Sequence, residues 1–210
     1  MDGVIVDSEP LHEQSFLEVW NDMGYQENHG IHFPDFYGRS DRILWEAFIE
    51  KHRPEQTIEE LIGLREERLI RMLHDIKPLF DGVLPLIKRL AKQYPLGLAS
   101  GSIHRVIDVV LAIENLRSYF KEITSSEDVL EPKPSPQTFL LSAKRMGITP
   151  HKCCVIEDSI NGVKAGNAAG MTVLAITNTF GKEELLQSGA TLTFENYNGI
   201  DNYFSPERKN

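Results

Sequence analysis

The sequence is short of three features, and each shortage excludes a class of protein. Its apolar runs are only a few residues long, whereas about 20 apolar residues are needed for a helix to span a bilayer. The first residues lack a basic stretch, an apolar core and a small-residue cleavage site, so no usual signal peptide is expected. The two cysteines, Cys153 and Cys154, are adjacent, and neighbours on a strand point to opposite faces and cannot readily pair. We therefore expect buried free thiols in a cytoplasmic protein.

Positive charge is also scarce. The chain has 22 Lys and Arg against 31 Asp and Glu among its 210 residues, a formal net charge of -9. This balance argues against nucleic acid, because phosphate backbones are bound by clustered basic side chains. A small phosphorylated metabolite stays compatible with it, since one lysine, a metal ion and oriented backbone N–H groups suffice to bind a phosphate.

The second part of the chain alternates between strand-like and helix-like segments. The helix-like segments are 103–115, 136–146 and 160–169. The expected strands are 96–100, 122–125, 153–157, 171–176 and 190–194. Strands that alternate with helices predict an α/β fold with a parallel sheet flanked by helices. Ligands of such sheets bind beyond the C-terminal ends of the strands.

Residues 11–76 have a different pattern, with helical runs and no convincing strand. The expected helices are 11–23, 42–52 and 57–74. We expect residues 11–78 to form an all-helical cap domain, inserted into an α/β core domain built from residues 1–10 and 79–210.

Two polar turns stand at or near expected strand ends. Asp2-Gly3 precedes a short apolar run, and Ser100-Gly101-Ser102 ends one strand and begins a helix, with Ser102 expected as the helix N-cap. A hydroxyl group beside free N–H groups at a helix N-terminus is able to bind an anion. Each turn taken alone is also explained by ordinary turn chemistry.

Two further motifs carry charge. Lys133 stands between prolines in 131–136, a rigid extended segment that holds its ammonium group at little entropic cost. Glu157 and Asp158 end an apolar strand, where two adjacent carboxylates repel each other unless a cation lies beside them. Such oxygen ligands suit Mg²⁺, with phosphate and water completing its shell.

In this order, the motifs around Asp2, Ser100, Lys133 and Glu157-Asp158 resemble the haloacid dehalogenase superfamily. More narrowly, they are similar to its β-phosphoglucomutase-like phosphatase branch, which has a helical cap. The resemblance covers nearly the whole chain and implies a Rossmann-like α/β core, a Mg²⁺ cofactor and phosphoryl transfer through an aspartyl-phosphate.

The resemblance also implies a role for each matching residue. Asp2 matches the general acid/base, whose backbone carbonyl also binds Mg²⁺. Ser100, with Gly101 and Ser102, matches the turn that binds the transferring phosphoryl group. Lys133 matches the lysine that balances charge, and the matching acidic pair at the metal is Glu157 and Asp158, with Asp158 as the direct ligand.

The sequence departs from the family at its start. The family's nucleophilic aspartate lies two residues before the position of Asp2, and neither it nor its strand is present. In relatives that strand lies between the strands that here end at Ser100 and Glu157. We interpret this as a start assigned at an internal methionine, with a natural truncation as the alternative. The 210-residue form is expected to be weak or inactive as an enzyme.

Three functions follow from the resemblance. The first is Mg²⁺-dependent hydrolysis of a small organic monophosphate, such as a sugar phosphate or phosphoglycolate. The second is a β-phosphoglucomutase-type isomerase, which is disfavoured because the mutase has an arginine where Asp41 stands, unless Arg39, Arg42 or Arg65 replaces it. The third is a catalytically silent phosphate-ligand binder. We expect a monomer or weak dimer without nucleic-acid or membrane partners.

Overall fold

The computed structural model describes residues 1–36 and 41–205 and separates into two compact units. The α/β unit consists of Met1–Asp7 and Pro78–Asn210, and the helical unit of Ser8–Lys77. The helical unit thus begins and ends within a few residues of the expected cap, 11–78. In the part of the chain that is described, no helix combines the length and the apolar character needed to cross a membrane.

In the described residues of the helical unit there are three α-helices and two short 3₁₀ turns. They are α1 (Glu9–Asp22), α2 (Asp41–His52), α3 (Ile58–Ile76), η1 (Gln26–His29) and η2 (Phe33–Phe36). Helix α3 packs against both α1 and α2. It starts from a capping box, in which the Thr57 hydroxyl accepts from the Glu60 N–H and the Glu60 carboxylate accepts from the Thr57 N–H.

Aromatic side chains fill the core of the helical unit. Trp20, Trp45 and Phe48 are fully buried there. The His29 ring stacks on Trp20 with 4.3 Å between centroids, and burial lowers the pKa of this histidine. His32 instead lies 3.2 Å from Asp35, so each of the two loop histidines has a local structural partner.

The described part of the α/β unit contains five parallel strands and the helices that cover them. Its strands are β1 (Leu96–Ala99), β2 (Phe120–Thr124), β3 (Cys154–Glu157), β4 (Thr172–Ile176) and β5 (Leu192–Phe194). Its helices are α4 (Val83–Leu90), α5 (His104–Ala112), α6 (Gln137–Met146), α7 (Ile160–Ala168), α8 (Lys182–Gln187) and α9 (Tyr197–Tyr203). Its 3₁₀ turns are η3 (Ile113–Tyr119), η4 (Ser126–Asp128) and η5 (Pro150–Lys152).

Every predicted strand and helix is present, with ends that differ by at most three residues. Helices α4, α8 and α9 were not predicted from the sequence. Helix α4 was recognisable, because its buried residues Val83, Leu86, Ile87 and Leu90 follow the spacing of one helix face. The fold class is the predicted one: an α/β unit with parallel strands flanked by helices, and an inserted all-helical unit.

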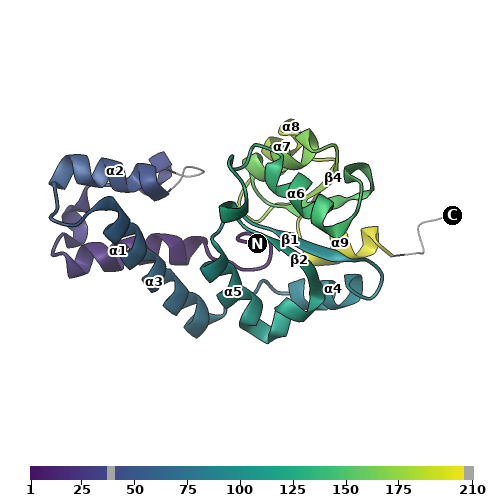
Figure 1. Ribbon diagram of the computed structural model, residues 1–210, viewed down its shortest axis with the longest axis horizontal. Helices are drawn as coiled ribbons and strands as arrows, with labels where there is room; N and C mark the ends of the chain where they lie inside the picture. Colours follow the sequence, from purple (N-terminus) through teal and green to yellow (C-terminus); the bar gives the residue numbers. More distant parts are fainter. Residues whose placement is uncertain (37–40, 206–210) are drawn as a thin grey trace. The chain divides into compact units, whose positions relative to one another are not determined.

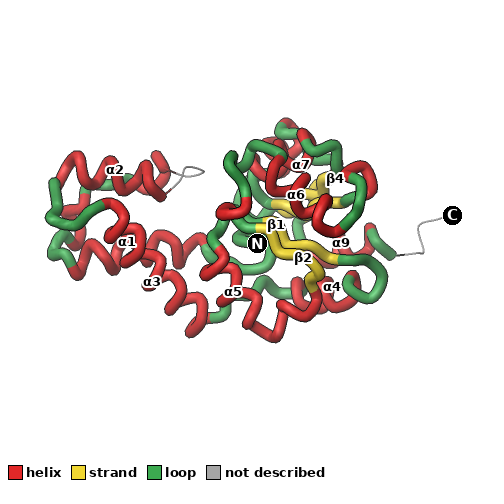
Figure 2. The backbone as a smooth tube through the Cα atoms, viewed as in Figure 1, coloured by secondary structure: helices red, strands yellow, loops and turns green. Residues whose placement is uncertain are grey.

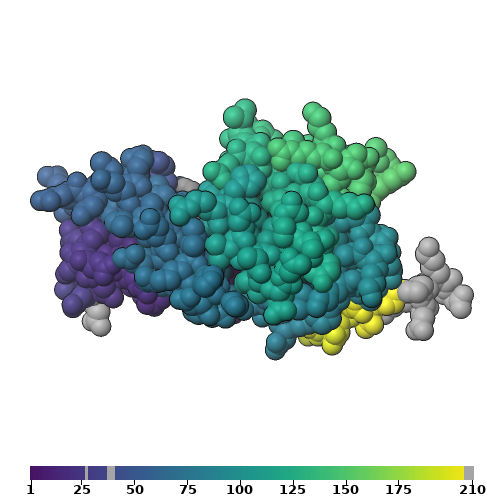
Figure 3. All heavy atoms as spheres, turned by 60° about the horizontal axis from the view of Figure 1, so that its bottom comes forward, coloured from purple at the N-terminus to yellow at the C-terminus, as the bar shows by residue number. Residues whose placement is uncertain are grey.

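Helices cover the strands of the α/β unit on two sides. Helix α6 packs on β1 and β2, while α7 packs on β3 and β4. Both lie on the side of the strands away from α4 (Figures 1 and 2). Helix α4 packs against α9, and Figure 3 shows the yellow side chains of α9 beside the blue-teal ones of α4.

Helix α7 approaches the strands closely because it carries small residues. A Cβ atom added at Gly166 would lie 2.8 Å from a methyl group of Val173. One added at Gly162 would lie within 2.0–2.2 Å of the Glu157 carboxylate. Any larger residue at these positions would therefore push the helix off the sheet.

The strands form two separate sheets. One pairs β1 with β2, and the other has the order β3-β4-β5. Among the described residues no strand pairs with the remaining edge of β1 or of β3. This interruption lies between the strands that end at Ser100 and Glu157, where the sequence analysis placed a missing strand.

Both cysteines are free, as expected, but neither is buried, whereas buried thiols were predicted. Cys153 is half-buried and Cys154 is exposed. Cys154 belongs to β3 and stands at the edge that no described strand covers, so it is open to solvent.

The turn after β2 is held together by the carboxylate of Asp128. The Asp128 carboxylate accepts from the Ser125 N–H at 2.8 Å and pairs with Arg145 and His104 at 3.1 Å. The Ser125 N–H is the largest contribution that lowers the pKa of Asp128 to about 2, and Arg145 and His104 add to it against the opposing effect of burial.

We expect Asp128→Asn to lower the free energy of unfolding by about 1–2 kcal/mol at pH 7. Since the pKa of Asp128 is depressed in the folded state, this contribution is complete above pH ~4 and disappears as the pH falls towards 2. Urea denaturation between pH 3 and pH 7 measures it. The exposed Glu131→Gln serves as control with little change, and an equal loss in both variants at pH 7 would contradict the assignment.

Candidate functional site

Polar side chains gather where β1 and β3 end. Lys133 connects the two strands, because its ammonium donates to Glu157 Oε1 at 2.5 Å and to the Ala99 carbonyl at 3.3 Å. Its charge also lies 4.6 Å from the centroid of the Phe139 ring. The lysine side chain is 13% exposed and that of Glu157 is 7% exposed, so the ion pair is buried. The cis peptide bond between Lys133 and Pro134 belongs to the same rigid segment.

Both oxygens of Glu157 are engaged. Besides Oε1 on Lys133, Oε2 accepts from the Asp158 N–H at 3.1 Å, the Ser159 N–H at 3.2 Å and the Ser159 hydroxyl at 3.0 Å. Burial alone would raise the pKa of Glu157, but Lys133, the terminal amino group of Met1 and the Ser159 N–H outweigh it and lower the pKa. Glu157 is therefore held as a carboxylate that positions Lys133.

Asp158 is in a different electrostatic situation. It accepts from the Thr179 hydroxyl at 2.5 Å. Burial, together with repulsion from the neighbouring Glu157, raises the pKa of Asp158 to about 6 against the opposing effects of Thr179 and the terminal amino group. The carboxyl group therefore gains from any cation that comes to lie beside it.

The N-terminal turn brings Asp2 to the same place. The Ser102 hydroxyl donates to Asp2 Oδ2 at 2.7 Å. Gly3 has a φ angle of +67°, and a Cβ atom there would lie 1.9 Å from Asp158 Oδ2. Only glycine fits this backbone position, which places the segment that carries Asp2 directly against Asp158.

The expected role of Ser102 as N-cap of the following helix is wrong. Ile103 occupies the N-cap position without a side-chain hydrogen bond, and the His104 N–H donates instead to the Glu127 carboxylate at 2.7 Å. The Ser102 hydroxyl is used by Asp2, which explains the difference. Ser100 is buried and its hydroxyl accepts from the Ser102 N–H at 3.1 Å, while Gly101 is exposed.

Three residues of this neighbourhood were not identified from the sequence. Besides Thr179, Asn178 donates to the Gly3 carbonyl at 2.7 Å, and Tyr197 donates to the Val4 carbonyl at 2.7 Å. Asn178 and Thr179 follow the end of β4 at Ile176, with Thr177 between. Polar residues beyond the C-terminal end of a predicted parallel strand were the signal that could have found them.

The chemistry of these oxygen donors fits a magnesium ion. The described residues contain no group of three His, Cys, Asp or Glu side chains that could hold a metal ion. Mg²⁺, however, is commonly held by one or two carboxylates together with phosphate and water. Asp158, whose buried carboxyl group gains from a neighbouring cation, could bind such an ion directly, and Asp2 lies on the adjacent segment. A direct bond to Glu157 would displace Lys133 or the Ser159 donors.

In the helical unit, the described arginines that were considered as phosphate ligands form ion pairs with neighbouring acidic residues. Arg65 is buried and donates to Asp41 at 2.6 Å, and it also contacts His12. Arg42 pairs with Glu59 at 3.2 Å. Arg39 and its neighbours 37–40 lie outside the described residues.

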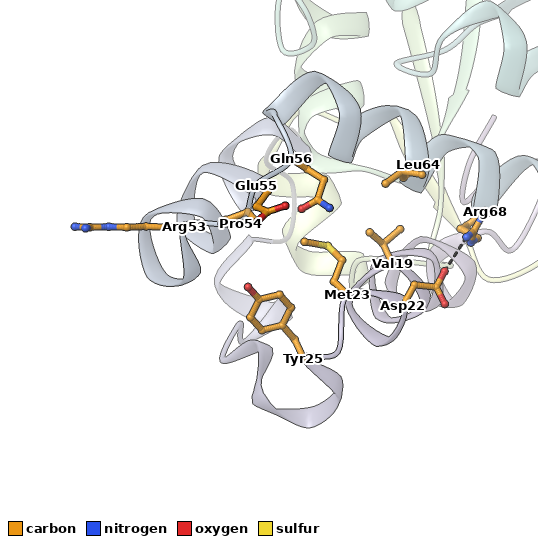
Figure 4. Close-up of a pocket in the computed structure, with 10 residues that line it drawn as sticks. All are labelled: Val19, Asp22, Met23, Tyr25, Arg53, Pro54, Glu55, Gln56, Leu64 and Arg68. Carbon is orange, nitrogen blue, oxygen red and sulfur yellow. Dashed lines mark hydrogen bonds and ion pairs between the residues drawn. The ribbon is translucent and has the colours of Figure 1, made fainter.

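A hollow of about 440 Å³ lies within the helical unit (Figure 4). It is lined by Val19, Asp22, Met23, Tyr25, Arg53, Pro54, Glu55, Gln56, Leu64 and Arg68. Arg68 donates to Asp22 at 2.7 Å, and Figure 4 shows Arg53 pointing away from the other side chains. This lining includes acidic and basic side chains, and they are not arranged as a catalytic site.

Known proteins resemble this chain over most of its length. Hexitol phosphatase B of Escherichia coli (strain K12) is 33% identical over 84% of this chain and 80% of its own. The fructose-1-phosphate phosphatase YqaB of the same organism is 32% identical over 84% of this chain and 93% of its own. Among solved structures, a HAD hydrolase of family IA, variant 3, from Entamoeba histolytica is 25% identical. It matches with a TM-score of 0.83 over 95% of this chain and 92% of its own.

The family comparison agrees with these relatives. The model of the haloacid dehalogenase-like hydrolases matches residues 1–176, which include Asp2, Ser100, Lys133 and the Glu157-Asp158 pair. The structural neighbours share the Rossmann-like core and the helical insertion. The chain belongs to the haloacid dehalogenase-like hydrolase family.

Proposed function

We propose that this chain is the scaffold of a Mg²⁺-dependent phosphatase that hydrolyses a small organic monophosphate, of the sugar phosphate or phosphoglycolate kind. The single observation that carries the proposal is the bridge from Ala99 through Lys133 to Glu157, which holds one positive charge between the ends of β1 and β3. The relatives named as phosphatases of hexitol and fructose phosphates support the substrate class. The protein's partner would be a small phosphorylated metabolite in the cytoplasm.

Each residue would have one task. Lys133 would neutralise charge on the phosphoryl group, and Ser100 with Ser102 and the Gly101 turn would bind its oxygens. Asp2, half-buried and held by Ser102, would protonate the leaving oxygen and later accept a proton from water. When bound, a magnesium ion would neutralise charge between the phosphoryl oxygens and Asp158.

The helical unit favours hydrolysis over isomerisation. An isomerase of the mutase type needs a second cationic group for a distal phosphate. Asp41 is an acid, Arg65 is buried against it, and Arg42 pairs with Glu59. Within the described residues, these contacts leave neither arginine as a ready phosphate clamp.

We expect Asp158→Asn to raise the free energy of unfolding by about 1–3 kcal/mol at pH 7 in the absence of divalent ions, since it removes a buried charge beside Glu157. The pKa of Asp158 is raised in the folded state. The wild-type chain therefore loses this stability as the pH rises from about 4 to about 6. Thermal denaturation with and without millimolar Mg²⁺ measures both effects.

The same experiment tests the metal. Mg²⁺ should stabilise the wild-type chain and should not stabilise the Asp158→Asn variant. Asp201→Asn, at an acid that pairs with Arg89 in α4, is a control that should keep the magnesium effect. Equal stabilisation of wild type and Asp158→Asn by Mg²⁺ would contradict the assignment of Asp158.

The proposed chemistry needs a nucleophile. We expect the 210-residue polypeptide to release phosphate slowly or not at all, because no carboxylate stands two residues before Asp2. A form extended upstream by a short apolar strand ending in Asp, with one residue between it and Asp2, should gain activity. The gain should be on the order of 10⁶, the loss seen when a catalytic nucleophile is removed.

Phosphate release from a panel of sugar monophosphates with Mg²⁺ measures the gain. The matched control is the same extension ending in Asn, which should fold equally well and remain inactive. If the 210-residue form and the extended form turn over substrate equally, the role of the upstream aspartate is refuted. If both forms bind a sugar phosphate and Mg²⁺ without turnover, the protein is a catalytically silent phosphate-ligand binder and the phosphatase proposal is wrong.

A further inference from the structure

The turn that carries Asp2 is built around a flexible residue. Gly3 follows Asp2 directly and has a φ angle of +67°, a conformation that glycine adopts easily and also leaves easily. Rotation about the backbone of Gly3 would swing Asp2 relative to the rest of the turn. The position of Asp2 therefore depends on contacts that fix the peptide groups beside this glycine.

Hydrogen bonds inside the turn use its N–H groups. The Gly3 N–H donates to the Val6 carbonyl at 2.9 Å, and the Ile5 N–H donates to the Met1 carbonyl at 2.7 Å. The carbonyl groups of Gly3 and Val4 accept instead from side chains outside the turn. Because a backbone carbonyl in a folded chain needs a donor, these outside contacts decide how the two peptide groups are oriented.

Two side chains supply those donors. Asn178, in the loop after β4, donates from its amide nitrogen to the Gly3 carbonyl at 2.7 Å. Tyr197, the first residue of α9, donates from its hydroxyl to the Val4 carbonyl at 2.7 Å. Two successive peptide groups of the turn are thus held by segments 175 and 193 residues further along the chain.

The same two side chains also bind each other. The Asn178 amide nitrogen donates to the Tyr197 hydroxyl at 3.0 Å. An amide nitrogen carries two hydrogens and a phenol carries one, so each hydrogen in this arrangement has one acceptor. Tyr197 is buried, and this burial raises the pKa of its hydroxyl, which therefore keeps the proton that it donates to Val4. We call Asn178 and Tyr197 the clasp.

The clasp is anchored to the rest of the α/β unit. The ring of Tyr197 lies 6.1 Å from that of Phe80 between centroids, and the Phe80 N–H donates to the Ile5 carbonyl at 3.1 Å. In the loop after β4, the Thr177 N–H donates to the Phe194 carbonyl of β5 at 2.9 Å. Both residues of the clasp therefore stand on segments that are themselves fixed.

Other contacts hold Asp2 from its remaining side. The Ser102 hydroxyl donates to Asp2 Oδ2 at 2.7 Å, so the carboxylate is located by Ser102 and the backbone that follows it by the clasp. A Cβ atom at Gly3 would meet the carboxylate of Asp158, and Thr179 donates to that carboxylate at 2.5 Å. The loop after β4 thus fixes both the turn that carries Asp2 and the carboxylate of Asp158 beside it.

We infer that Asn178 and Tyr197 are positioning residues for Asp2, which hold its turn so that the carboxyl group stands where a general acid/base has to act. This inference rests on the function proposed above and adds two residues that act through the backbone of the turn. A displacement of about 1 Å at a reacting group can cost on the order of 100-fold in rate. Loss of the clasp should therefore lower kcat and leave KM unchanged, because Ser100 and Lys133 keep their contacts.

Hydrogen exchange in the 210-residue chain tests the clasp without relying on activity. Tyr197→Phe removes only the hydroxyl, and Asn178→Ala removes an amide from a surface position where the variant should fold. Each should speed exchange of the Gly3 and Ile5 N–H groups by at least about fivefold, as expected for the loss of one hydrogen bond. The Thr191 N–H, which donates to a carbonyl of β4 at 2.8 Å, should exchange at an unchanged rate.

The form extended upstream by an apolar strand ending in Asp tests the positioning of Asp2. In it, Tyr197→Phe should lower kcat for a sugar monophosphate by at least about tenfold, while KM stays within about twofold. The matched control is Tyr203→Phe, the same substitution in the same helix, at a residue that is 37% exposed. This control should change neither the exchange rates of the turn nor kcat.

Faster exchange in both clasp variants, together with a lower kcat at constant KM, supports the proposal. It is overturned if Tyr197→Phe and Tyr203→Phe give the same exchange rates in the turn. It is also overturned if exchange becomes faster while kcat is unchanged or only KM rises, because the turn is then held without positioning Asp2. If the extended parent releases no phosphate, the phosphatase proposal fails, and the exchange rates still confirm or refute that the clasp holds the turn.

Discussion

The buried ion pair between Lys133 and Glu157 is the interaction on which the α/β unit's polar centre depends. Glu157 ends β3, and Lys133 carries the contact across to Ala99 at the end of β1. Removing either partner would leave the other charge buried without compensation, a loss of about 3–5 kcal/mol. Glycine at position 162 is part of the same arrangement, since a side chain there would occupy the space of the Glu157 carboxylate. The close packing of α7 against β3 and the position of the Glu157 carboxylate therefore depend on the same glycine.

Much of the fold followed from local sequence patterns. Apolar runs of strand length, separated by helical segments with Ser, Gly and Pro at their ends, located every strand of the α/β unit and the main helices of both units. The short helices α8 and α9 were missed because six or seven residues show too little periodicity. Local sequence patterns could not predict the register of the strands or which strands share a sheet. The interruption between β1 and β3 was nevertheless expected from the resemblance to a known family.

The sequence indicated which polar residues gather at the ends of β1 and β3 but not the contacts that they make there. Asp2, Lys133 and the Glu157-Asp158 pair were marked by charge at turn positions. The partner of each could not be read from spacing, because the contacts join segments up to 193 residues apart, as between Tyr197 and Val4. Ser102 shows the difficulty. A serine before a helix favours capping locally, but the distant carboxylate of Asp2 takes its hydroxyl in the folded chain.

The interrupted sheet has a consequence for how the α/β unit transmits motion. In a continuous sheet, the backbone ladder couples the twist of neighbouring strands, so a rotation at one edge is carried to the other. Here the β1-β2 pair and the β3-β4-β5 sheet are joined across the interruption by side chains, above all by Lys133. Lys133 fixes the end of β1 relative to the end of β3, so a change in its ion pair would reach both sheets.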